Sequence, residues 1–316
     1  EKLNGIISAL LSTNTYDGTL VTDIGLANSK NEPFDIHRLS LFRSLANYLN
    51  RCDFLPVKYE YSKLGWMNLS FFESYFSNYI EGTEFDISEA EKIIFQNEEI
   101  DNRHADSHDV LAVYKQVNEY QEMSSTPQTS DELIQRLKER HFAMMLERPD
   151  KRPGQFKEKV NHAGASVFVK PDEVEGTITQ AFPIYESLPA GLPRAIFMQF
   201  LIAECHPFDD GNGRLSRIMM NAELHASGQY KLIVPTVHRD SYLNGLRSAT
   251  RNGEFKTIVK VFYQLQRYTA SIDWADYGEA RGSLEEHCAD KSPDQGVAVF
   301  NNQIRQFTFF PPVQMS

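Results

Sequence analysis

The twelve residues from His206 to Arg217 read HPFDDGNGRLSR, and they decide how the chain folds around them. The run before them, 194–205, is apolar nearly all round, which is typical of a buried helix. Residues 211–213 are Gly-Asn-Gly, and a second helix is predicted to follow them to about residue 226. We therefore expect two helices joined by a short loop. The residues able to carry chemistry lie in this loop and at the start of the second helix.

The start of the second predicted helix has the properties of an anion-binding site. The first turn of a helix has unpaired N–H donors and the positive end of the helix dipole. Gly211 and Gly213 have no Cβ that would shield those donors. Arg214 and Arg217 are three residues apart, so they lie on one helix face beside that turn. Two guanidinium groups at this place indicate a polyphosphate ligand.

Two further side chains of the run carry chemistry that suits a polyphosphate. Asp210 is a hard oxygen ligand, able to hold a Mg²⁺ ion that bridges phosphate oxygens. His206 stands at the entrance to the predicted anion-binding site, where an imidazole can take a proton from an attacking hydroxyl. Taken singly, such features are more often structural, because Gly-Asn-Gly is usually a turn and an Arg pair is usually a solvated helix face. Their coincidence in twelve residues favours a functional site.

The run resembles the Fic motif HPFx(D/E)GNGRxxR, and all nine specified positions match. The resemblance extends over roughly 69–268 and implies an all-α fold, namely a Fic-type helical bundle with a small β-hairpin flap. It also implies a role for each motif residue: His206 as general base, Asp210 as the Mg²⁺ ligand, Gly211, Asn212 and Gly213 as the cradle of the α- and β-phosphates of ATP, Arg214 on the β-phosphate, and Arg217 on the γ-phosphate.

The resemblance assigns further residues outside the motif. The flap residues expected over the nucleotide, where the family also docks the target chain by main-chain pairing, are Asn161, His162, Ala163 and Gly164. Tyr242 resembles a family aromatic near the adenine, and packing in the core is an equally good interpretation of it. Cys205, beside His206, is interpreted as a packed thiol at the end of a buried helix rather than as a nucleophile.

A second motif lies upstream of the first. Residues 77–82 read SNYIEG and resemble the Fic inhibitory motif (S/T)xxxE(G/N). The resemblance makes Ser77, Glu81 and Gly82 an inhibitory turn in which Glu81 pairs with Arg217. A carboxylate there occupies the guanidinium fork that the γ-phosphate needs. This placement is that of the class II type, with the inhibitor ahead of the core in the same chain; the plainer alternative is that Glu81 merely ends a helix.

The rest of the pattern is mostly helical. Apolar spacing, capping residues and Gly or Pro stops predict further helices over 38–50, 70–80, 86–95, 107–123, 129–146, 239–250 and 255–268. Gly82 is expected to end the second of these in the left-handed conformation. Residues 148–171 are rich in Pro and Gly, and 166–169 reads as a short strand, so an extended flap is expected there.

Composition limits the class of protein. The chain has 316 residues, of which 41% are hydrophobic and 24% charged, as in ordinary globular proteins. Its net charge of −11 makes a general nucleic-acid partner unexpected. Without a run of about 18 apolar residues, no membrane partner is expected either. Three widely spaced cysteines suit a reducing cytoplasm, although a chain that starts at Glu1 leaves a trimmed leader open.

The predicted organisation has four parts. They are an N-terminal region (1–68), a helical region with the inhibitory helix (69–125), a Fic core (126–270), and a tail or small added element (271–316). The sequence does not name the target protein and leaves the oligomeric state open, a homodimer included.

The predicted function is that of a protein adenylyltransferase, a nucleotidyltransferase that moves AMP from ATP onto a Ser, Thr or Tyr hydroxyl of a target protein. Mg²⁺ is the expected cofactor, and Glu81 is the expected inhibitor. One alternative is an enzyme of the same fold that removes AMP or transfers another phosphate-containing group. The other is a nucleotide-sensing regulatory module, against which the intact His206 argues.

Overall fold

The computed structural model describes residues 33–164 and 166–312, and these residues form an all-α fold with one short β-hairpin, as the sequence predicts. Residues 1–32 of the predicted N-terminal region lie outside the described residues. The α-helices are α3 Ile36–Leu49, α4 Lys63–Ile80, α5 Ile87–Glu91, α6 His104–Asn118, α7 Tyr120–Met123, α8 Ser130–Met144, α9 Val174–Glu186, α10 Leu192–Cys205, α11 Asn212–Ala226, α12 Arg239–Asn252, α13 Lys256–Ala270, α14 Tyr277–Glu286 and α15 Pro293–Ile304.

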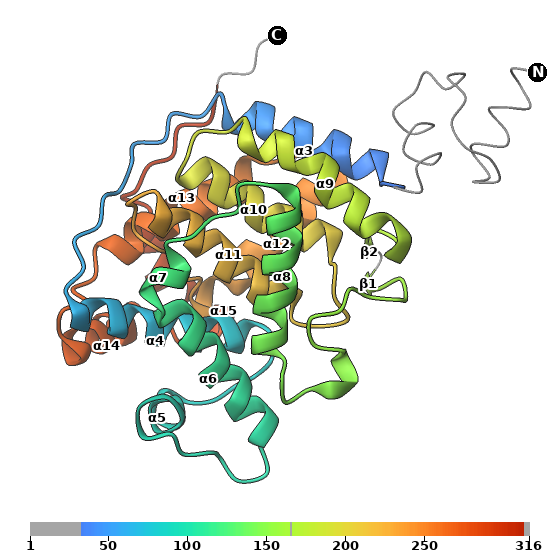
Figure 1. The fold of residues 1–316 in the computed structure, drawn as a ribbon. Coiled ribbons are helices and arrows are strands. Elements are labelled where there is room, and N and C mark those ends of the chain that lie inside the picture. Colours follow the sequence, from blue (N-terminus) through green and yellow to red (C-terminus); the bar gives the residue numbers. More distant parts are fainter. Residues whose placement is uncertain (1–32, 165, 313–316) are drawn as a thin grey trace, which may run out of the picture.

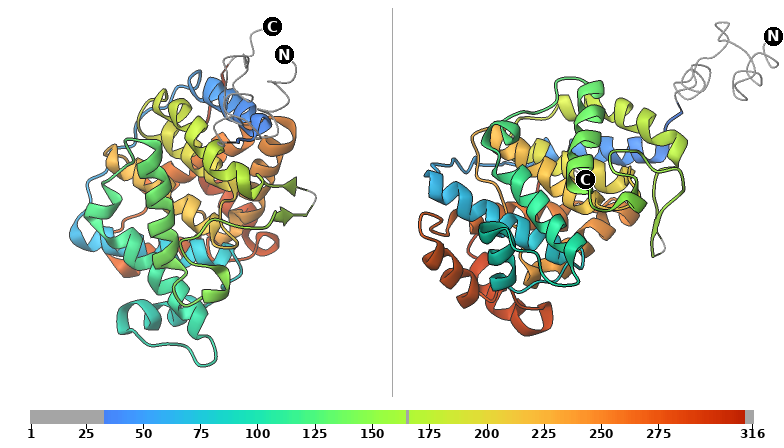
Figure 2. Two further views of the ribbon diagram at one scale, coloured as in Figure 1. Left: turned by 45° about the vertical axis from the view of Figure 1, so that its right-hand side comes forward. Right: turned by 60° about the horizontal axis from the view of Figure 1, so that its bottom comes forward.

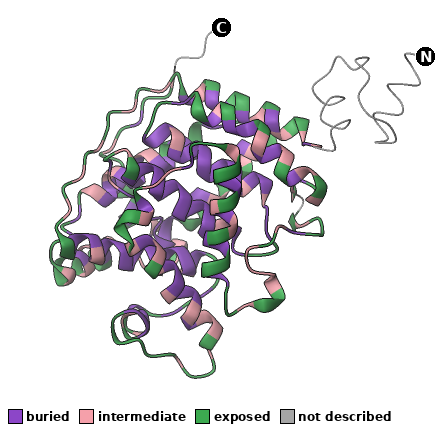
Figure 3. Ribbon diagram, viewed as in Figure 1, coloured by how far each residue is buried: buried purple, intermediate pink, exposed green. Residues whose placement is uncertain are grey.

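The helices α10 and α11 lie side by side in the middle of the molecule (Figure 1). The sequence predicts this pair, and both helices are buried along most of their length (Figure 3). Helices α3 and α9 pack on α10, while α4 and α6 pack on each other and on α11. The loop 206–211 between the two central helices is therefore surrounded by other elements.

Helix α4 delivers the predicted inhibitory turn to this centre. It begins at Lys63, seven residues before the expected start, because the Ser62 side chain caps it by accepting a hydrogen bond from the Gly65 N–H at 3.0 Å. It ends at Ile80 with Glu81 as the C-cap residue, and Gly82 follows with φ +95°. The left-handed stop expected at Gly82 is confirmed. Fourteen of the helix's eighteen residues are buried, which fixes its last turn firmly in the core.

The predicted flap is a hairpin of two very short strands. β1 His162–Ala163 pairs antiparallel with β2 Ser166–Val167, with His162 opposite Val167. The strand is thus shorter than the expected 166–169. Figure 2 shows the hairpin extending from the helical body. One connection to that body is the Arg38 guanidinium of α3, whose Nη2 donates to the Val167 carbonyl at 2.7 Å.

Other differences from the sequence prediction concern helix boundaries. The helix expected over 107–123 is interrupted at Glu119, giving α6 and α7. The sequence assigns no element to α9, which contains Pro183, a residue that normally stops a helix. In the predicted tail, α14 and α15 are regular helices whose buried residues include Leu284 and Phe300. No helix of the described residues is long and apolar enough to cross a membrane.

Candidate active site

The loop between α10 and α11 is fixed by its own backbone and by Asn212. His206 ends α10 with φ +46°, and Gly211 precedes α11 with φ +75°, so both residues are left-handed. The Asn212 side chain accepts from the Phe208 N–H at 2.9 Å and donates to the Phe208 carbonyl at 2.8 Å. Phe208 is fully buried and anchors the loop. The predicted turn is therefore a tight, internally bonded structure.

A buried histidine on α8 holds the same loop from outside. His141 Nε2 lies 3.0 Å from the Asp210 carbonyl, and its Nδ1 accepts from the Gly154 N–H at 2.9 Å. This pattern requires the neutral Nε2–H tautomer. Burial lowers the pKa of His141 to about 4, which keeps that form at neutral pH. The imidazole also stacks on Phe208, with ring centroids 3.8 Å apart. His141 thus supports the loop through both bonding and packing.

The predicted flap residue Asn161 is also directed at the loop. Its Nδ2 donates to the Phe208 carbonyl at 2.9 Å, and its Oδ1 accepts from Lys157 Nζ at 2.7 Å. Lys157 Nζ lies 3.2 Å from the Cys205 carbonyl as well, and the Lys157 backbone N–H donates to the Pro207 carbonyl. Asn161 was expected over the nucleotide, whereas the structure places its side chain against the loop backbone.

His206 is exposed to a cavity and carries no strong hydrogen bond. Its Nδ1 is 3.4 Å from the Ala203 carbonyl, and its ring stacks on Phe168 with centroids 3.9 Å apart. Burial lowers the pKa of His206 to about 4, so the imidazole is neutral at pH 7. A neutral imidazole can accept a proton, as a general base must.

The cavity has a volume of about 260 Å³. It lies between the hairpin segment, the end of α10, the first turns of α11, and α12. The residues that line it are Glu81, Ser166, Phe168, Ala203, Glu204, His206, Gly213, Ser216, Arg217, Tyr242, Leu243, Leu246, Arg247 and Thr250. It brings together His206, Gly213 and Arg217 from the core motif with Glu81 from the upstream motif, as the resemblance to the Fic motifs implies.

Arg217 is held by the last turn of α4. Its Nη2 donates to Glu81 Oε1 at 2.7 Å and to the Ser77 carbonyl at 2.8 Å. Its Nε donates to the Ser77 hydroxyl at 3.0 Å. The Arg217 side chain is only 4% exposed, and that of Glu81 is 35% exposed. All three contacts come from the predicted inhibitory turn, and the expected ion pair of Glu81 and Arg217 is present.

Glu81 also lies against the first turn of α11. A Cβ added to Gly213 would collide with the Glu81 carboxylate, so the carboxylate occupies space that any other residue at 213 would fill. The N–H groups of such a turn are the anion seat that the sequence predicts. In this structure the anion at the seat is therefore the side chain of Glu81 itself.

Tyr242 is a core residue that also borders the cavity. It is buried, with 2% of its surface exposed, and it packs on Phe262. Its hydroxyl accepts from Gln199 Nε2 at 2.9 Å and lies 3.5 Å from Arg217 Nη1. The residue is part of the core and also forms part of the cavity wall.

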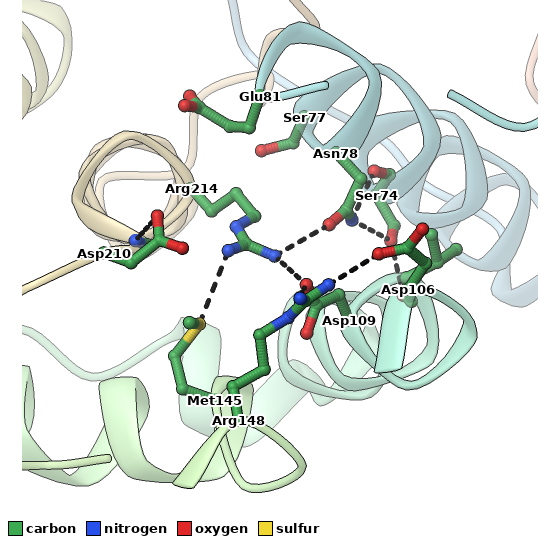
Figure 4. Close-up of polar contacts among 12 residues, drawn as sticks. Ser74, Ser77, Asn78, Glu81, Asp106, Asp109, Met145, Arg148, Asp210 and Arg214 are labelled. Atoms are coloured by element: carbon green, nitrogen blue, oxygen red, sulfur yellow. Dashed lines mark hydrogen bonds and ion pairs between the residues drawn. The ribbon is translucent and has the colours of Figure 1, made fainter. Parts of the chain in front are cut away.

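Arg214 does not line the cavity that contains Arg217, and Figure 4 shows its guanidinium between Asp109, Asn78 and Met145. Its Nη1 donates to Asp109 Oδ2 of α6 at 2.6 Å and lies 3.4 Å from Asn78 Oδ1 of α4. The two arginines of the motif thus contact α4 through neighbouring residues, Asn78 and Ser77. Arg214 also contacts α6 through Asp109, and Arg217 has no hydrogen bond to α6.

The two aspartates of the loop have different partners. Asp209 Oδ2 accepts from Arg152 Nε at 2.8 Å. Asp210 Oδ1 accepts from the Gly211 N–H at 2.6 Å, which leaves its other oxygen for a ligand. Among the described residues no group of three or more His, Cys, Asp or Glu side chains gathers to form a metal site. This donor set fits Mg²⁺, which is commonly held by one or two carboxylates together with substrate phosphates and water.

The remaining predicted residues are placed as follows. His162, Ala163 and Gly164 form the first strand and turn of the hairpin, and neither His162 nor Gly164 lines the cavity. The hairpin reaches the cavity instead through Ser166 and Phe168. Cys205 is fully buried, and burial raises the pKa of its thiol, so it is a packed side chain as predicted.

Sequence reasoning missed four residues that hold the site, namely Asp109, His141, Lys157 and Phe168. Asp109 gives the clearest sequence signal. It adjoins Val110 and precedes Val113 by four residues, so it lies beside the apolar stripe of its helix. A carboxylate there needs a cation from another element. The others have no comparable signal, because a single His, Lys or Phe in a polar segment is usually exposed or merely packed.

Comparison with known proteins agrees with the motif. Residues 127–224 match the model of the Fic/DOC family. A Fido domain-containing protein of Dictyostelium discoideum is 34% identical over 104 residues, covering 31% of this chain and 72% of that protein. A protein named protein adenylyltransferase Fic, from Drosophila yakuba, is 25% identical over 191 residues. That match covers 59% of this chain and only 38% of the Drosophila protein.

Two solved structures share the fold. A Fic domain containing signaling protein from Bacteroides thetaiotaomicron has a TM-score of 0.56 at 19% identity, covering 77% of this chain and 97% of that one. A Fic protein from C. elegans has a TM-score of 0.53 at 18% identity, covering 74% of this chain and 69% of that chain. At these identities the likeness concerns the fold alone.

Proposed function

The chain belongs to the Fic family, and on this premise we propose that it is a protein adenylyltransferase that moves AMP from ATP onto a Ser, Thr or Tyr hydroxyl of a target protein. The observation that carries the proposal is the cavity in which the neutral imidazole of His206 faces the first turn of α11 and Arg217. A general base and an anion seat in one cavity are what transfer of a phosphate-linked group requires.

The proposed reaction is an attack by the target hydroxyl on the α-phosphate of ATP. His206 accepts the hydroxyl proton as the new O–P bond forms, and the bond to the β-phosphate breaks to release pyrophosphate. The N–H groups at the start of α11 hold the phosphates, and Arg217 binds the γ-phosphate. Asp210 would hold Mg²⁺, which would neutralise phosphate charge when bound. The contribution of this chain is therefore mainly positioning and charge.

We further propose that Glu81 holds the protein inactive. Its carboxylate engages Arg217 at 2.7 Å and lies against Gly213, so it occupies both places assigned to phosphate oxygens. The cavity volume of about 260 Å³ is also small, since ligand pockets commonly measure roughly 300–1,000 Å³. ATP can bind productively only when the Glu81 side chain leaves.

One observation favours a second activity. Glu81 and His206 line the same cavity, so a carboxylate and an imidazole face the place where an AMP group would lie. Glu81 can orient a water molecule there, and the protein would then remove AMP from a modified hydroxyl. The two activities respond in opposite ways to Glu81→Gly, because removal needs the carboxylate and addition is opposed by it. A synthetic peptide that carries AMP on threonine tests for removal.

The direct test uses ATP labelled on either the α- or the γ-phosphate. The Glu81→Gly variant is incubated with Mg²⁺, a cell lysate and each nucleotide in turn. Label from α-labelled ATP that the lysate alone does not acquire, with no such added label from γ-labelled ATP, supports AMP transfer. Label from the γ-phosphate alone would indicate phosphoryl transfer. Binding of ATP without labelling of any protein would indicate a nucleotide-sensing module instead.

A further inference from the structure

Arg214 has an unusual environment for an arginine expected to bind phosphate. Its side chain is 4% exposed, and the Asp109 side chain that pairs with it is 1% exposed. The ion pair, 2.6 Å between Nη1 and Oδ2, is thus almost wholly removed from water (Figure 4). Charge pairs in such a place are rigid, because neither partner has water as an alternative.

The two edges of the Arg214 guanidinium differ. Nη1 is bonded to Asp109 and lies near Asn78, whereas Nε is buried with no hydrogen-bond partner. The remaining nitrogen, Nη2, contacts only the sulfur of Met145 at 3.4 Å. The edge formed by Nε and Nη2 therefore has no oxygen acceptor. Such an edge matches two oxygens of a phosphate or carboxylate group.

The unpaired edge, formed by Nε and Nη2, faces the loop 206–211. The Met145 sulfur that Nη2 contacts lies 3.0 Å from the place a Cβ on Gly211 would take. In Figure 4, Asp210 lies on the side of Arg214 away from Asp109. The Asp109 carboxylate thus binds the side of the guanidinium that lies away from this loop. The free edge, formed by Nε and Nη2, points to the start of α11.

Asp109 is itself fixed independently of the inhibitory turn. It belongs to α6, and the Oδ2 that binds Arg214 also accepts from Arg148 Nε at 2.9 Å. Arg148 Nη2 in turn bonds to Asp106 at 2.6 Å. None of these contacts involves Glu81 or Ser77, so they persist when the last turn of α4 releases Arg217. Asn78 offers Arg214 only a longer contact, at 3.4 Å.

We propose that Asp109 is the positioning residue for Arg214, holding its Nε and Nη2 edge toward the β-phosphate of the nucleotide. The inference rests on the proposed function, which places a polyphosphate at the start of α11. Asp109 touches neither nucleotide nor target. It acts through Arg214 alone, and it remains in place in both the inhibited and the active protein.

The test compares the affinities for AMP and ADP, measured with Mg²⁺ by calorimetry in the Glu81→Gly background. AMP lacks the β-phosphate, so its binding does not depend on how Arg214 is oriented. Asp109→Asn should lower the ADP affinity at least about tenfold, as expected when a charge-assisted hydrogen bond is misaligned, while the AMP affinity stays within about twofold. A general loss of structure would lower both affinities together.

Asp106→Asn is the matched control, because Asp106 lies one turn earlier on α6 and shares Arg148 but does not touch Arg214. It should leave the ratio of ADP to AMP affinity unchanged. Should Asp109→Asn fail to fold, the double variant Asp109→Asn with Arg148→Met restores the charge balance, and it must show the same selective loss of ADP binding.

Three results are decisive against the inference or its premise. Equal loss of AMP and ADP binding in a folded variant, or no loss of either, overturns the positioning role of Asp109. A change of ratio in the Asp106→Asn control as large as that in Asp109→Asn overturns it as well. If the Glu81→Gly parent binds neither ADP nor ATP, the proposed function itself fails, and this outcome is visible before any Asp109 variant is made.

Discussion

The Glu81 carboxylate lies 2.7 Å from Nη2 of Arg217, and the two residues are 136 positions apart in the chain. One ends α4 and the other belongs to the second turn of α11. Ser77, one turn before Glu81, takes two more of the Arg217 donors through its hydroxyl and its carbonyl. The last turn of α4 thereby supplies three hydrogen-bond acceptors to the Arg217 guanidinium. Any ligand that needs Arg217 must first displace that turn or its carboxylate.

His206→Ala should abolish transfer and leave Mg·ATP binding intact. The imidazole stacks on Phe168 and makes no strong hydrogen bond that supports the loop. The loss of a general base costs roughly 10²–10⁴ in rate. Calorimetry and a transfer assay in the Glu81→Gly background measure the two effects separately. Loss of nucleotide binding would mean that His206 has a structural role instead.

Asp210→Asn should weaken Mg·ATP binding and abolish activity, because the metal loses its anionic ligand. Asp209→Asn is the matched neighbour and should have a mild effect, since Asp209 is bonded to Arg152. Titration of Mg²⁺ at fixed ATP compares the two variants. An equal loss of Mg²⁺ affinity in both variants would show that Asp210 is not the specific metal ligand.

The protein should lose stability as the pH falls from about 6.5 toward 4, and His141 should contribute to the loss. Burial lowers the pKa of His141 from 6.5 to about 4, so the unfolded chain takes up a proton at higher pH than the folded one. Protons then favour unfolding throughout that interval, by up to about 3 kcal/mol for such a group. Above this interval the contribution of His141 is constant.

Urea unfolding across this pH range tests the contribution of His141. The free energy of unfolding of His141→Asn should fall less steeply with decreasing pH than that of the wild type, whatever its absolute value. Identical slopes for the two proteins would show that His141 is not the group responsible.

The elements with strong local signals could be predicted from the sequence. The motif loop, the pair α10 and α11 and the left-handed Gly82 follow from apolar runs and glycine positions. The Glu81 and Arg217 pair was expected only through the resemblance to a family motif. Helix α9 could not be predicted, because Pro183 normally ends a helix, and here the buried side chains of Ile178 and Phe182 outweigh that preference.

The supports of the site were harder to predict for a different reason. His141 bonds to Asp210, 69 residues away, and Asp109 bonds to Arg214, 105 residues away. Contacts of this kind depend on how the helices pack, and the periodicity of a single sequence does not encode that packing. Asn161 illustrates the same limit. Its segment adjoins the hairpin, yet its side chain is directed to the loop backbone.

The intact mass of the purified protein after incubation with Mg·ATP shows whether Glu81 restrains AMP transfer and whether His206 catalyses it. Three proteins are compared: the wild type, Glu81→Gly, and Glu81→Gly with His206→Ala. Glu81→Gly should gain the mass of AMP at a rate on the order of 10² above the wild type, since small misplacements of reacting groups are that costly. The double variant should gain none. Equal modification of the wild type and Glu81→Gly would rule out the inhibitory role of Glu81, and modification that survives the loss of His206 would rule out His206 as the general base.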